Sequence, residues 1–422
     1  MPSFAQPVPK ARRLEWSGAA VRKGSGVRMT TNSLLCGGTA ARARAMAALL
    51  GPRIVRDAGE RPFEGRGLAG DSGRALSLFA LARGGDPLYE EAARSQLRRV
   101  VLAEDRPGAG LFGGMSGLRG VAGILALEEP RYGKLVEQCD AFIDEQLPPP
   151  GDERVAASAD FDVISGWSGM RLARCVAGSG ERDRLIDLLA WVMADDRRWC
   201  CLHPMRLNEA PENDLGLAHG IPGVLAAVAL TMGTLDDELR ALLARCAHDV
   251  RRHARRKGER ILWPGHAQAE AGVVVRSAWC YGTPGVAAAL YWSARALGDR
   301  ELGDFALEAL EGEARASLEE WGAVDHALCH GTLGNALVFA SVGTQSENPV
   351  LLEAVERAAS AALDGLERDG GACWGMAMDM TRQDLWSELD GAAGIALALL
   401  TLVGDADSTW LRLHALEPLA FV

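Results

Sequence analysis

A pair of glycines three positions apart, followed by a nearly uncharged run rich in Ala and Leu, recurs seven times in this chain of 422 residues. The first glycines of the pairs stand 44 to 62 residues apart, at Gly70, Gly114, Gly166, Gly220, Gly282, Gly331 and Gly391. Because the chain holds 49 glycines, such pairs also arise by chance, so the apolar run is the informative part. Each run predicts a helix that is buried on most sides.

Charged amphipathic stretches lie between these apolar runs. They include residues 181–196, 236–256, 301–321 and 348–368. An apolar helix that alternates with an amphipathic one seven times describes an inner ring of helices wrapped by an outer ring, and no alternating strand pattern competes with it. We therefore predict an all-α protein with a single catalytic domain, a seven-fold α/α toroid. The alternative is an open superhelical array of helix pairs.

Residues 1–34 stand apart from the repeats, which we expect to form one domain over residues 35–422. The segment carries six basic residues against the single Glu15, with Pro, Ser and Gly between them. We predict a basic, flexible N-terminal tail. Docking of an acidic peptide on this segment is the alternative.

The composition excludes several classes of protein. A net charge of -11 gives no support to nucleic-acid binding. No run of about 18 apolar residues is present, so we do not expect an integral membrane protein. The N-terminal arginines have no apolar core behind them, which argues against a secretory signal. Nine cysteines, an odd number, favour free thiols or metal ligands in a reducing cytoplasm.

The residue immediately before the first glycine is reactive in several repeats. In chain order this position holds Ala69, Gly113, Ser165, His219, Tyr281, His330 and Asp390. One place earlier stand Cys280 and Cys329. If the repeats form a ring, these side chains meet at one end of its central cavity. They then lie beside the N-termini of the inner helices, whose free N–H groups favour anions such as thiolates.

Cys280, Cys329 and His330 together form a soft donor set that suits zinc. Three protein ligands leave a fourth position open, as in catalytic zinc sites, and no paired Cys-x-x-Cys motif offers a closed structural site. The alternative is that both cysteines are buried apolar side chains, which is the common fate of a free cysteine. Their shared register and the adjacent histidine favour zinc.

Several other cysteines, histidines and acidic residues are not expected to bind the metal. A group outside the register is interpreted as incidental thiols and nearby histidines: Cys200, Cys201, His203 and His326. Asp390 and Glu388, from the last repeat, are expected at the rim of the cavity, solvated or facing a substrate.

Three segments resemble the signature motifs of the LanC family of lanthipeptide cyclases. They are GLAHGIPG at 216–223, WCYGTPG at 279–285 and CHGTLG at 329–334. Asp162, in FDVISG, and Arg276, three residues before Trp279, also match that family's pattern. The resemblance extends from about residue 35 to the end, because all seven glycine repeats belong to it. It implies a seven-fold α/α toroid with a zinc ion (Zn2+) at its centre.

The resemblance further implies a stand-alone class I cyclase in the cytoplasm, or at the membrane through a complex with a separate dehydratase and a membrane exporter. Its substrate would be a precursor peptide with a leader, already dehydrated at Ser or Thr. A peptide cysteine would add across a dehydroalanine or dehydrobutyrine double bond and close a thioether ring. Zinc would deprotonate that thiol, whose ordinary pKa is about 8.5.

The same resemblance suggests roles for individual side chains. We expect His219 to be the general acid that protonates the α-carbon; a fourth zinc ligand or a plain core histidine are the alternatives. Asp162 would orient His219, while Arg276 would stabilise the enolate oxygen or pair with Asp162. Tyr281 and Trp279 would line the site, with plain packing as the alternative for each.

Two other functions are compatible with these motifs. One is the addition of glutathione, or another small thiol, to dehydroamino acids in proteins, as eukaryotic LanC-like relatives do. The other is a non-catalytic zinc-containing scaffold within a biosynthetic complex. The three hypotheses differ in the product formed from a dehydrated peptide.

Overall fold

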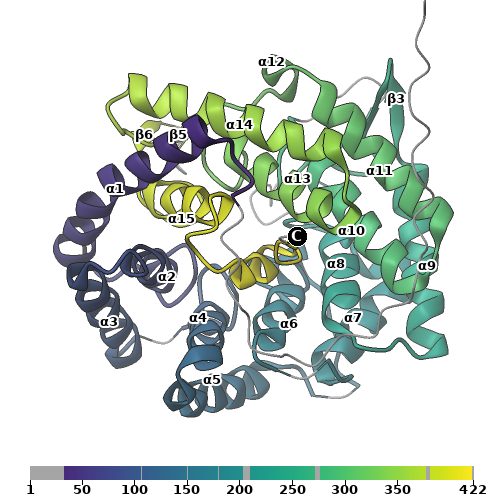
Figure 1. Cartoon of the computed structure of the whole chain (residues 1–422). Helices are drawn as coiled ribbons and strands as arrows, with labels where there is room; N and C mark the ends of the chain where they lie inside the picture. The colour runs from purple at the N-terminus through teal and green to yellow at the C-terminus, as the bar shows by residue number, and fades with distance from the viewer. Residues whose placement is uncertain are drawn as a thin grey trace, which may run out of the picture.

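The inner helices begin where the glycine pairs predict them. A computed structural model describes residues 33–105, 107–149, 151–178, 180–202, 210–270, 276–376 and 381–420. Within these ranges the seven apolar runs form α2 (Asp71–Ala82), α4 (Met115–Glu128), α6 (Trp167–Cys175), α8 (Ile221–Thr231), α10 (Thr283–Leu297), α13 (Thr332–Ser346) and α15 (Ala392–Leu402). Each starts directly after the first glycine of its pair. Together they form the inner ring of Figure 1.

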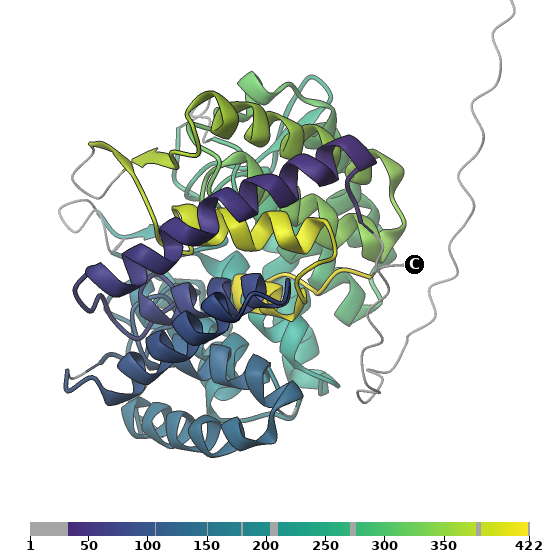
Figure 2. The same ribbon diagram turned by 60° about the vertical axis from the view of Figure 1, so that its left-hand side comes forward.

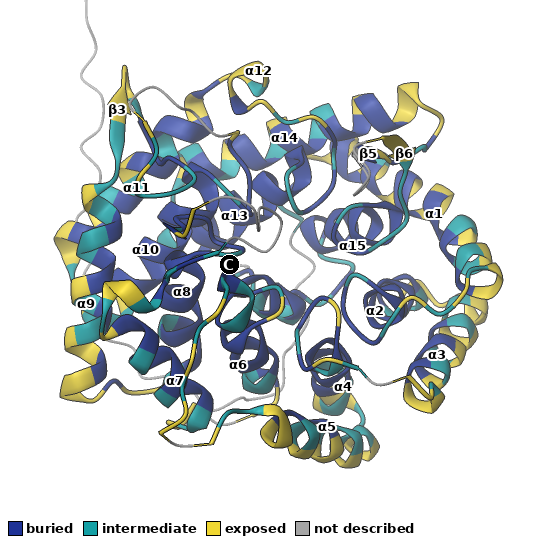
Figure 3. Cartoon of the chain, turned by 180° about the vertical axis from the view of Figure 1, so that it is seen from behind, coloured by how far each residue is buried: buried dark blue, intermediate teal, exposed yellow. Residues whose placement is uncertain are grey.

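Longer amphipathic helices cover this ring from outside. They are α1 (Gly37–Glu60), α3 (Pro87–Leu102), α5 (Gly133–Gln146), α7 (Arg184–Met193), α9 (Asp237–Arg252), α11 (Arg300–Arg315) and α14 (Pro349–Arg368). Figure 3 shows the ring from behind, with the inner helices buried and the exposed residues gathered on the outer helices. The arrangement confirms the predicted seven-fold α/α toroid.

The first helix of the chain closes the ring. In α1, Ala43, Leu50 and Ile54 are buried, and α1 packs across the last inner helix, α15, as Figure 2 shows. Just before α1, the backbone N–H of Leu34 donates to the carbonyl oxygen of Leu402, at 2.9 Å, where α15 ends. This closure excludes the open superhelical array. Residues 1–32 of the predicted tail lie outside the described residues. Leu35, the first residue of the predicted domain, is buried.

Short elements complete the fold. The α-helical and 3-10 turns are α12 (Leu318–Trp321), η1 (Pro130–Tyr132), η2 (Ser158–Asp160), η3 (Asp196–Arg198) and η4 (Thr409–His414). The strands, not expected from the sequence, pair as antiparallel β1 (Cys200–Cys201) with β2 (Glu212–Asn213), β3 (Arg255–Lys257) with β4 (Arg260–Leu262) and β5 (Trp374–Met376) with β6 (Arg382–Asp384). With two or three residues each, these strands are too short to produce an alternating pattern.

The glycine pairs are required by close backbone approach rather than by a left-handed backbone. Among the first glycines of the pairs, only Gly282 has a positive φ, of 91°. A Cβ added to the second glycine, however, would overlap backbone of the preceding turn in every repeat. At Gly117, for example, it would lie 2.6 Å from the Cα of Gly67, from the N of Leu68 and from the carbonyl oxygen of Leu111.

The centre of the ring is filled by the C-terminal segment. Figure 1 shows η4 between α15 and the inner helices α4 and α6. Its side chains Trp410, Leu411, Leu413 and His414 are buried. A search of the described residues finds no helix that is both long and apolar enough to cross a bilayer.

We expect Gly117→Ala to lower the free energy of unfolding by about 2 kcal/mol or more, because the added methyl group must displace backbone atoms. Gly38→Ala is the matched control, since nothing lies within 4 Å of a Cβ at that helical position. There alanine stabilises the helix by up to about 1 kcal/mol. Urea unfolding followed by circular dichroism measures both changes. Equal stability of the two variants would contradict this account of the pairs.

Candidate metal centre

Backbone hydrogen bonds join the turns that precede neighbouring inner helices. In each case a backbone N–H of one turn donates to a backbone carbonyl oxygen of the next turn, with N···O distances of 3.0–3.2 Å. The donor and acceptor residues are Ala69 and Phe112, Phe112 and Ile164, Val163 and Ala218, Ala218 and Cys280, Cys280 and Cys329, and Cys329 and Leu389. These bonds link all seven turns in sequence. The residues just before each first glycine are therefore held side by side at one end of the ring.

Cys280, Cys329 and His330 come together at this end. One donor atom from each lies within 4.8 Å of the other two, and Cys280 is buried. The Cys329 thiol, hydrogen-bonded to Cys280, lowers the pKa of Cys280, while the same contact and burial raise the pKa of Cys329 well above its ordinary value. The two sulfurs thus lie in hydrogen-bond contact, which a bound divalent cation would replace.

A buried carboxylate orients the histidine of this cluster. The Nε2 atom of His330 lies 3.2 Å from Oδ2 of Asp325, whose Oδ1 accepts the backbone N–H of Ala327 at 3.0 Å. This contact leaves Nδ1 of His330 as the nitrogen that can bind a metal ion. Burial lowers the pKa of His330, so the imidazole is neutral at neutral pH, as a metal ligand must be.

His219 is held by Asp162 in the neighbouring repeat. Its Nδ1 lies 2.6 Å from Oδ2 of Asp162, and Oδ1 of this buried aspartate accepts the backbone N–H groups of Ser165 and Gly166. Burial lowers the pKa of His219, but the hydrogen bond and charge of Asp162, with the charges of Asp214 and Cys280, outweigh burial. The pKa of His219 is therefore raised.

Tyr281 is oriented in the same way by a second buried aspartate. Its hydroxyl donates to Oδ2 of Asp214 at 2.5 Å, and Oδ1 of Asp214 accepts the backbone N–H of Gly216 at 2.7 Å. Burial raises the pKa of Asp214 to about 6. The rings of Tyr281 and His219 are 6.3 Å apart, centroid to centroid. Both side chains thus stand at one mouth of the ring.

The lanthionine synthetase C-like protein family is the family whose model matches this chain, over residues 65–414, a region that contains all seven glycine pairs. The chain belongs to this family. The nisin biosynthesis protein NisC of Lactococcus lactis subsp. lactis is 24% identical over 259 residues, which cover 52% of this chain and 59% of NisC. The match thus spans less than two thirds of that relative. The solved structure of a nisin cyclase has the same fold, with a TM-score of 0.67 at 17% identity, over 89% of this chain and 96% of that one.

Two aspartates of this LanC-like chain were missed by the sequence analysis. Asp214 and Asp325 both stand six residues before the first glycine of their pairs, and each accepts the backbone N–H two residues later. Arg276 occupies the same position in the repeat between them. Extending the alignment of the repeats from two to six residues before the first glycine reveals this register.

Arg276 lies at the rim rather than against Asp162. Its side chain is exposed, and after the Cys329 thiol its charge is among the influences that lower the pKa of Cys280. Asp162 instead uses its oxygens for His219 and two backbone N–H groups. Of the two roles foreseen for Arg276, the geometry favours the one at the mouth of the site.

Trp279 and Glu388 face the interior of the ring. The indole N–H of Trp279 donates to the carbonyl oxygen of His414 at 2.8 Å, so the structure gives Trp279 a packing position. The expectation that Glu388 lies at the rim is wrong, because its side chain is fully buried beside His414. Asp390 does reach the mouth: its side chain is 34% exposed, and its Oδ1 lies 3.8 Å from Nδ1 of His330.

The remaining cysteines and histidines of interest stay outside the cluster. His326 is half-buried and its Nδ1 lies 3.0 Å from the hydroxyl of Thr332. Cys200 and Cys201 form β1, while His203 lies outside the described residues. Within the described ranges, Cys280, Cys329 and His330 are the one group whose geometry suits a metal ion.

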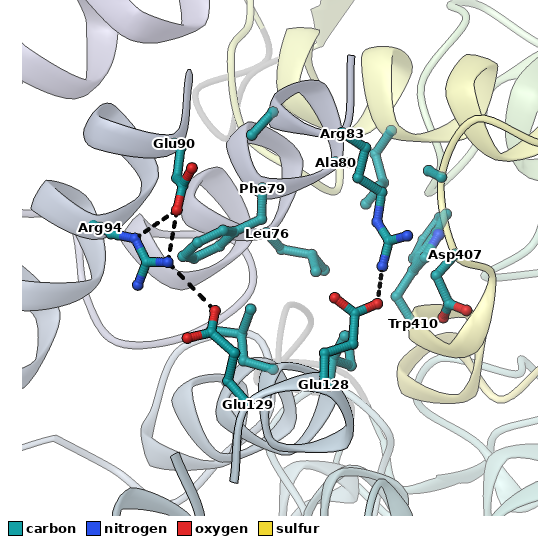
Figure 4. Close-up of a pocket in the computed structure, with 15 residues that line it drawn as sticks. Leu76, Phe79, Ala80, Arg83, Glu90, Arg94, Glu128, Glu129, Asp407 and Trp410 are labelled. Atoms are coloured by element: carbon teal, nitrogen blue, oxygen red, sulfur yellow. Dashed lines mark hydrogen bonds and ion pairs between the residues drawn. The ribbon is translucent and has the colours of Figure 1, made fainter. Parts of the chain in front are cut away.

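A pocket of about 260 Å³ lies away from this centre, at the C-terminal halves of α2 and α4 (Figure 4). Its arginines are paired with glutamates: Arg83 with Glu128, and Arg94 with Glu90 and Glu129. The charges of these side chains are therefore largely compensated. None of the cysteines or histidines discussed above lines this pocket.

We expect Asp325→Asn to weaken zinc binding by about 10-fold to 100-fold, because His330 loses the acceptor that fixes its orientation. Competition with a chromophoric chelator measures the affinity. Asp299→Asn is the matched control: Asp299 lies 3.0 Å from His248 on the outer ring and caps α11, and asparagine also caps helices. Cys280→Ala removes a proposed ligand, so we expect it to abolish zinc binding and to serve as the reference for complete loss. Unchanged affinity in Asp325→Asn would contradict the assignment.

Proposed function

We propose that this protein is a zinc-dependent lanthipeptide cyclase, which adds cysteine thiols of a dehydrated precursor peptide to dehydroalanine or dehydrobutyrine. The observation that carries the proposal is the cluster of Cys280, Cys329 and His330 beside the Asp162–His219 pair, in a member of the lanthionine synthetase C-like family. A thiol-binding centre and a proton donor are the two components that this addition requires.

The donor set supports zinc as the metal. The two cysteine sulfurs and the imidazole correspond to the thiolate and histidine ligands that zinc takes in catalytic sites with an open fourth position. Cys280, Cys329 and His330 would hold the ion. When bound there, zinc would lower the pKa of a peptide thiol below its ordinary value of about 8.5.

His219 would move the proton that the addition requires. The peptide thiol loses its proton to solvent, a new C–S bond forms at the β-carbon, the C=C double bond opens, and the α-carbon takes up one proton from His219, which solvent then reprotonates. The raised pKa of His219 keeps this imidazole protonated over a wider pH range, with Asp162 fixing its orientation. As negative charge develops on the adjacent amide oxygen, the exposed guanidinium of Arg276 at the rim would stabilise it. Tyr281, whose hydroxyl proton is donated to Asp214, would line the site.

The proposal implies particular partners. The substrate would be a precursor peptide with its leader, delivered by a separate dehydratase, and a membrane exporter would take the product. Such a complex would operate in the cytoplasm, where cysteines stay reduced.

The decisive experiment counts thiols, because cyclisation leaves the mass of the peptide unchanged. Dehydrated precursor is incubated with the zinc-loaded protein, alkylated with a thiol reagent and weighed by mass spectrometry. We expect fewer alkyl adducts than without the protein. As many adducts as in the control would rule the cyclase out, and glutathione adducts in place of rings would instead support the small-thiol transferase. A His219→Ala variant that keeps zinc but loses turnover would exclude the scaffold.

We expect Asp162→Asn to shift the alkaline limb of the cyclisation rate to lower pH. His219 donates a proton only below its pKa, so the rate falls as the pH rises through that value. Asparagine removes the carboxylate that raises the pKa, while burial, which lowers it, remains. Rates measured from pH 6 to 9, at constant zinc content, test this. Asp160→Asn, in the adjacent turn, is the control, and an alkaline limb that stays in place would refute the role of Asp162.

A further inference from the structure

One register of the repeats points into the centre of the ring. The residue three places before each first glycine is, in chain order, Gly67, Leu111, Val163, Leu217, Trp279, Leu328 and Glu388. All seven are buried. Six are glycine or apolar, so Glu388 places a single carboxyl group in an otherwise apolar layer. Its Cβ lies 2.6 Å from the position that a Cβ on Gly73 of the first repeat would take, so Glu388 joins this layer between the last repeat and the first.

The partner of Glu388 is a buried histidine of the C-terminal segment. Nε2 of His414 lies 3.1 Å from Oε1 of Glu388, and the two side chains are 4% and 0% exposed. This approach is a close polar contact without hydrogen-bond geometry, and among the described residues neither carboxylate oxygen and neither imidazole nitrogen forms a hydrogen bond with any other group. Because an isolated polar group is costly to bury, each of these two side chains requires the other.

Aromatic rings hold the histidine on its other sides. The imidazole of His414 lies 5.5 Å from the ring of Phe112, 5.5 Å from that of Trp279 and 5.1 Å from that of Trp410, centroid to centroid. An apolar side chain would fill such a cage without any polar contact. The presence of histidine is therefore explained by Glu388, not by the packing.

The pair connects to both cysteine turns of the metal centre. The carbonyl oxygen of His414 accepts the indole N–H of Trp279 at 2.8 Å, and Trp279 is bonded to Cys280. Glu388 is bonded to Leu389, whose carbonyl oxygen accepts the backbone N–H of Cys329 at 3.1 Å. The contact between Glu388 and His414 thus links the turn that carries Cys280 to the turn that carries Cys329 through buried residues.

We propose that Glu388 and His414 are positioning residues of the metal centre. The backbone N–H of Cys280 already donates to the carbonyl oxygen of Cys329, at 3.1 Å, and the Glu388–His414 contact adds a second, side-chain link between the two turns. This second link limits how far the turns can move relative to each other, and hence the geometry in which the two sulfurs meet one ion. In this arrangement the C-terminal η4 is a structural part of the metal centre as well as a filler of the ring. The inference depends on the metal site alone, whatever thiol the protein acts on.

A double variant separates positioning from stability. Glu388→Met with His414→Phe replaces the pair by apolar side chains of similar size, which often preserves or raises stability. It also keeps the backbone carbonyl that receives Trp279. We expect metal-free unfolding close to that of the wild type, zinc affinity at least about 10-fold weaker, and an altered sulfur-to-metal absorption band in the cobalt-loaded protein. Wild-type zinc affinity with an unchanged cobalt spectrum would overturn the proposal.

Two further variants complete the test. Trp410→Phe alters the cage around His414 without a link to either cysteine turn, so it should change stability and leave zinc affinity unchanged. Glu388→Gln keeps the shape of the side chain and replaces its carboxyl group by an amide. If the double variant does not fold, Glu388→Gln decides: weaker zinc binding supports the positioning role, and unchanged binding overturns it. All these measurements are made without peptide, so they stand apart from the test of cyclase activity.

Discussion

The hydrogen bonds between neighbouring turns are the constraint on which the rest of the structure depends. Each turn donates a backbone N–H to the next, from Ala69 around to Leu389, and the second glycine of each pair lets the backbones approach. A side chain at that glycine would meet the backbone of the turn that precedes its own helix and, at Gly117, the backbone of the neighbouring turn as well. Seven equivalent turns are therefore held at one end of the ring, and residues at equal distances from the glycines become neighbours in space.

This arrangement assigns a different environment to each register. The one or two residues before the first glycine reach the mouth, where the cysteines and His330 meet. The residue three places before it faces the buried centre, and there the chain places Trp279 and Glu388. The residue six places before it supplies Asp214 and Asp325, which orient Tyr281 and His330. The same turns thus supply both the candidate metal ligands and the aspartates that orient the side chains beside them.

Much of the fold was predictable because the pattern is local. Apolar runs after the glycines predict the number of inner helices, and a shared register is enough to predict that Cys280, Cys329 and His330 lie together. The closing role of α1 was not foreseen, because nothing in residues 37–60 says which inner helix they will cover. Glu388 was placed at the rim because its charge suggested solvent, whereas its partner, His414, comes from a distant segment.

The sequence by itself determined the seven-fold repeat, the family and the residues that can bind a metal, because each depends on residue type at a fixed distance from a glycine. Only the tertiary structure decided which side chains support them. The contacts of His219 with Asp162, of Tyr281 with Asp214 and of His414 with Glu388 join residues 26 to 67 positions apart. Such pairs form because a buried polar group needs a hydrogen-bonding or charged partner, and the ring brings these distant side chains within reach of one another.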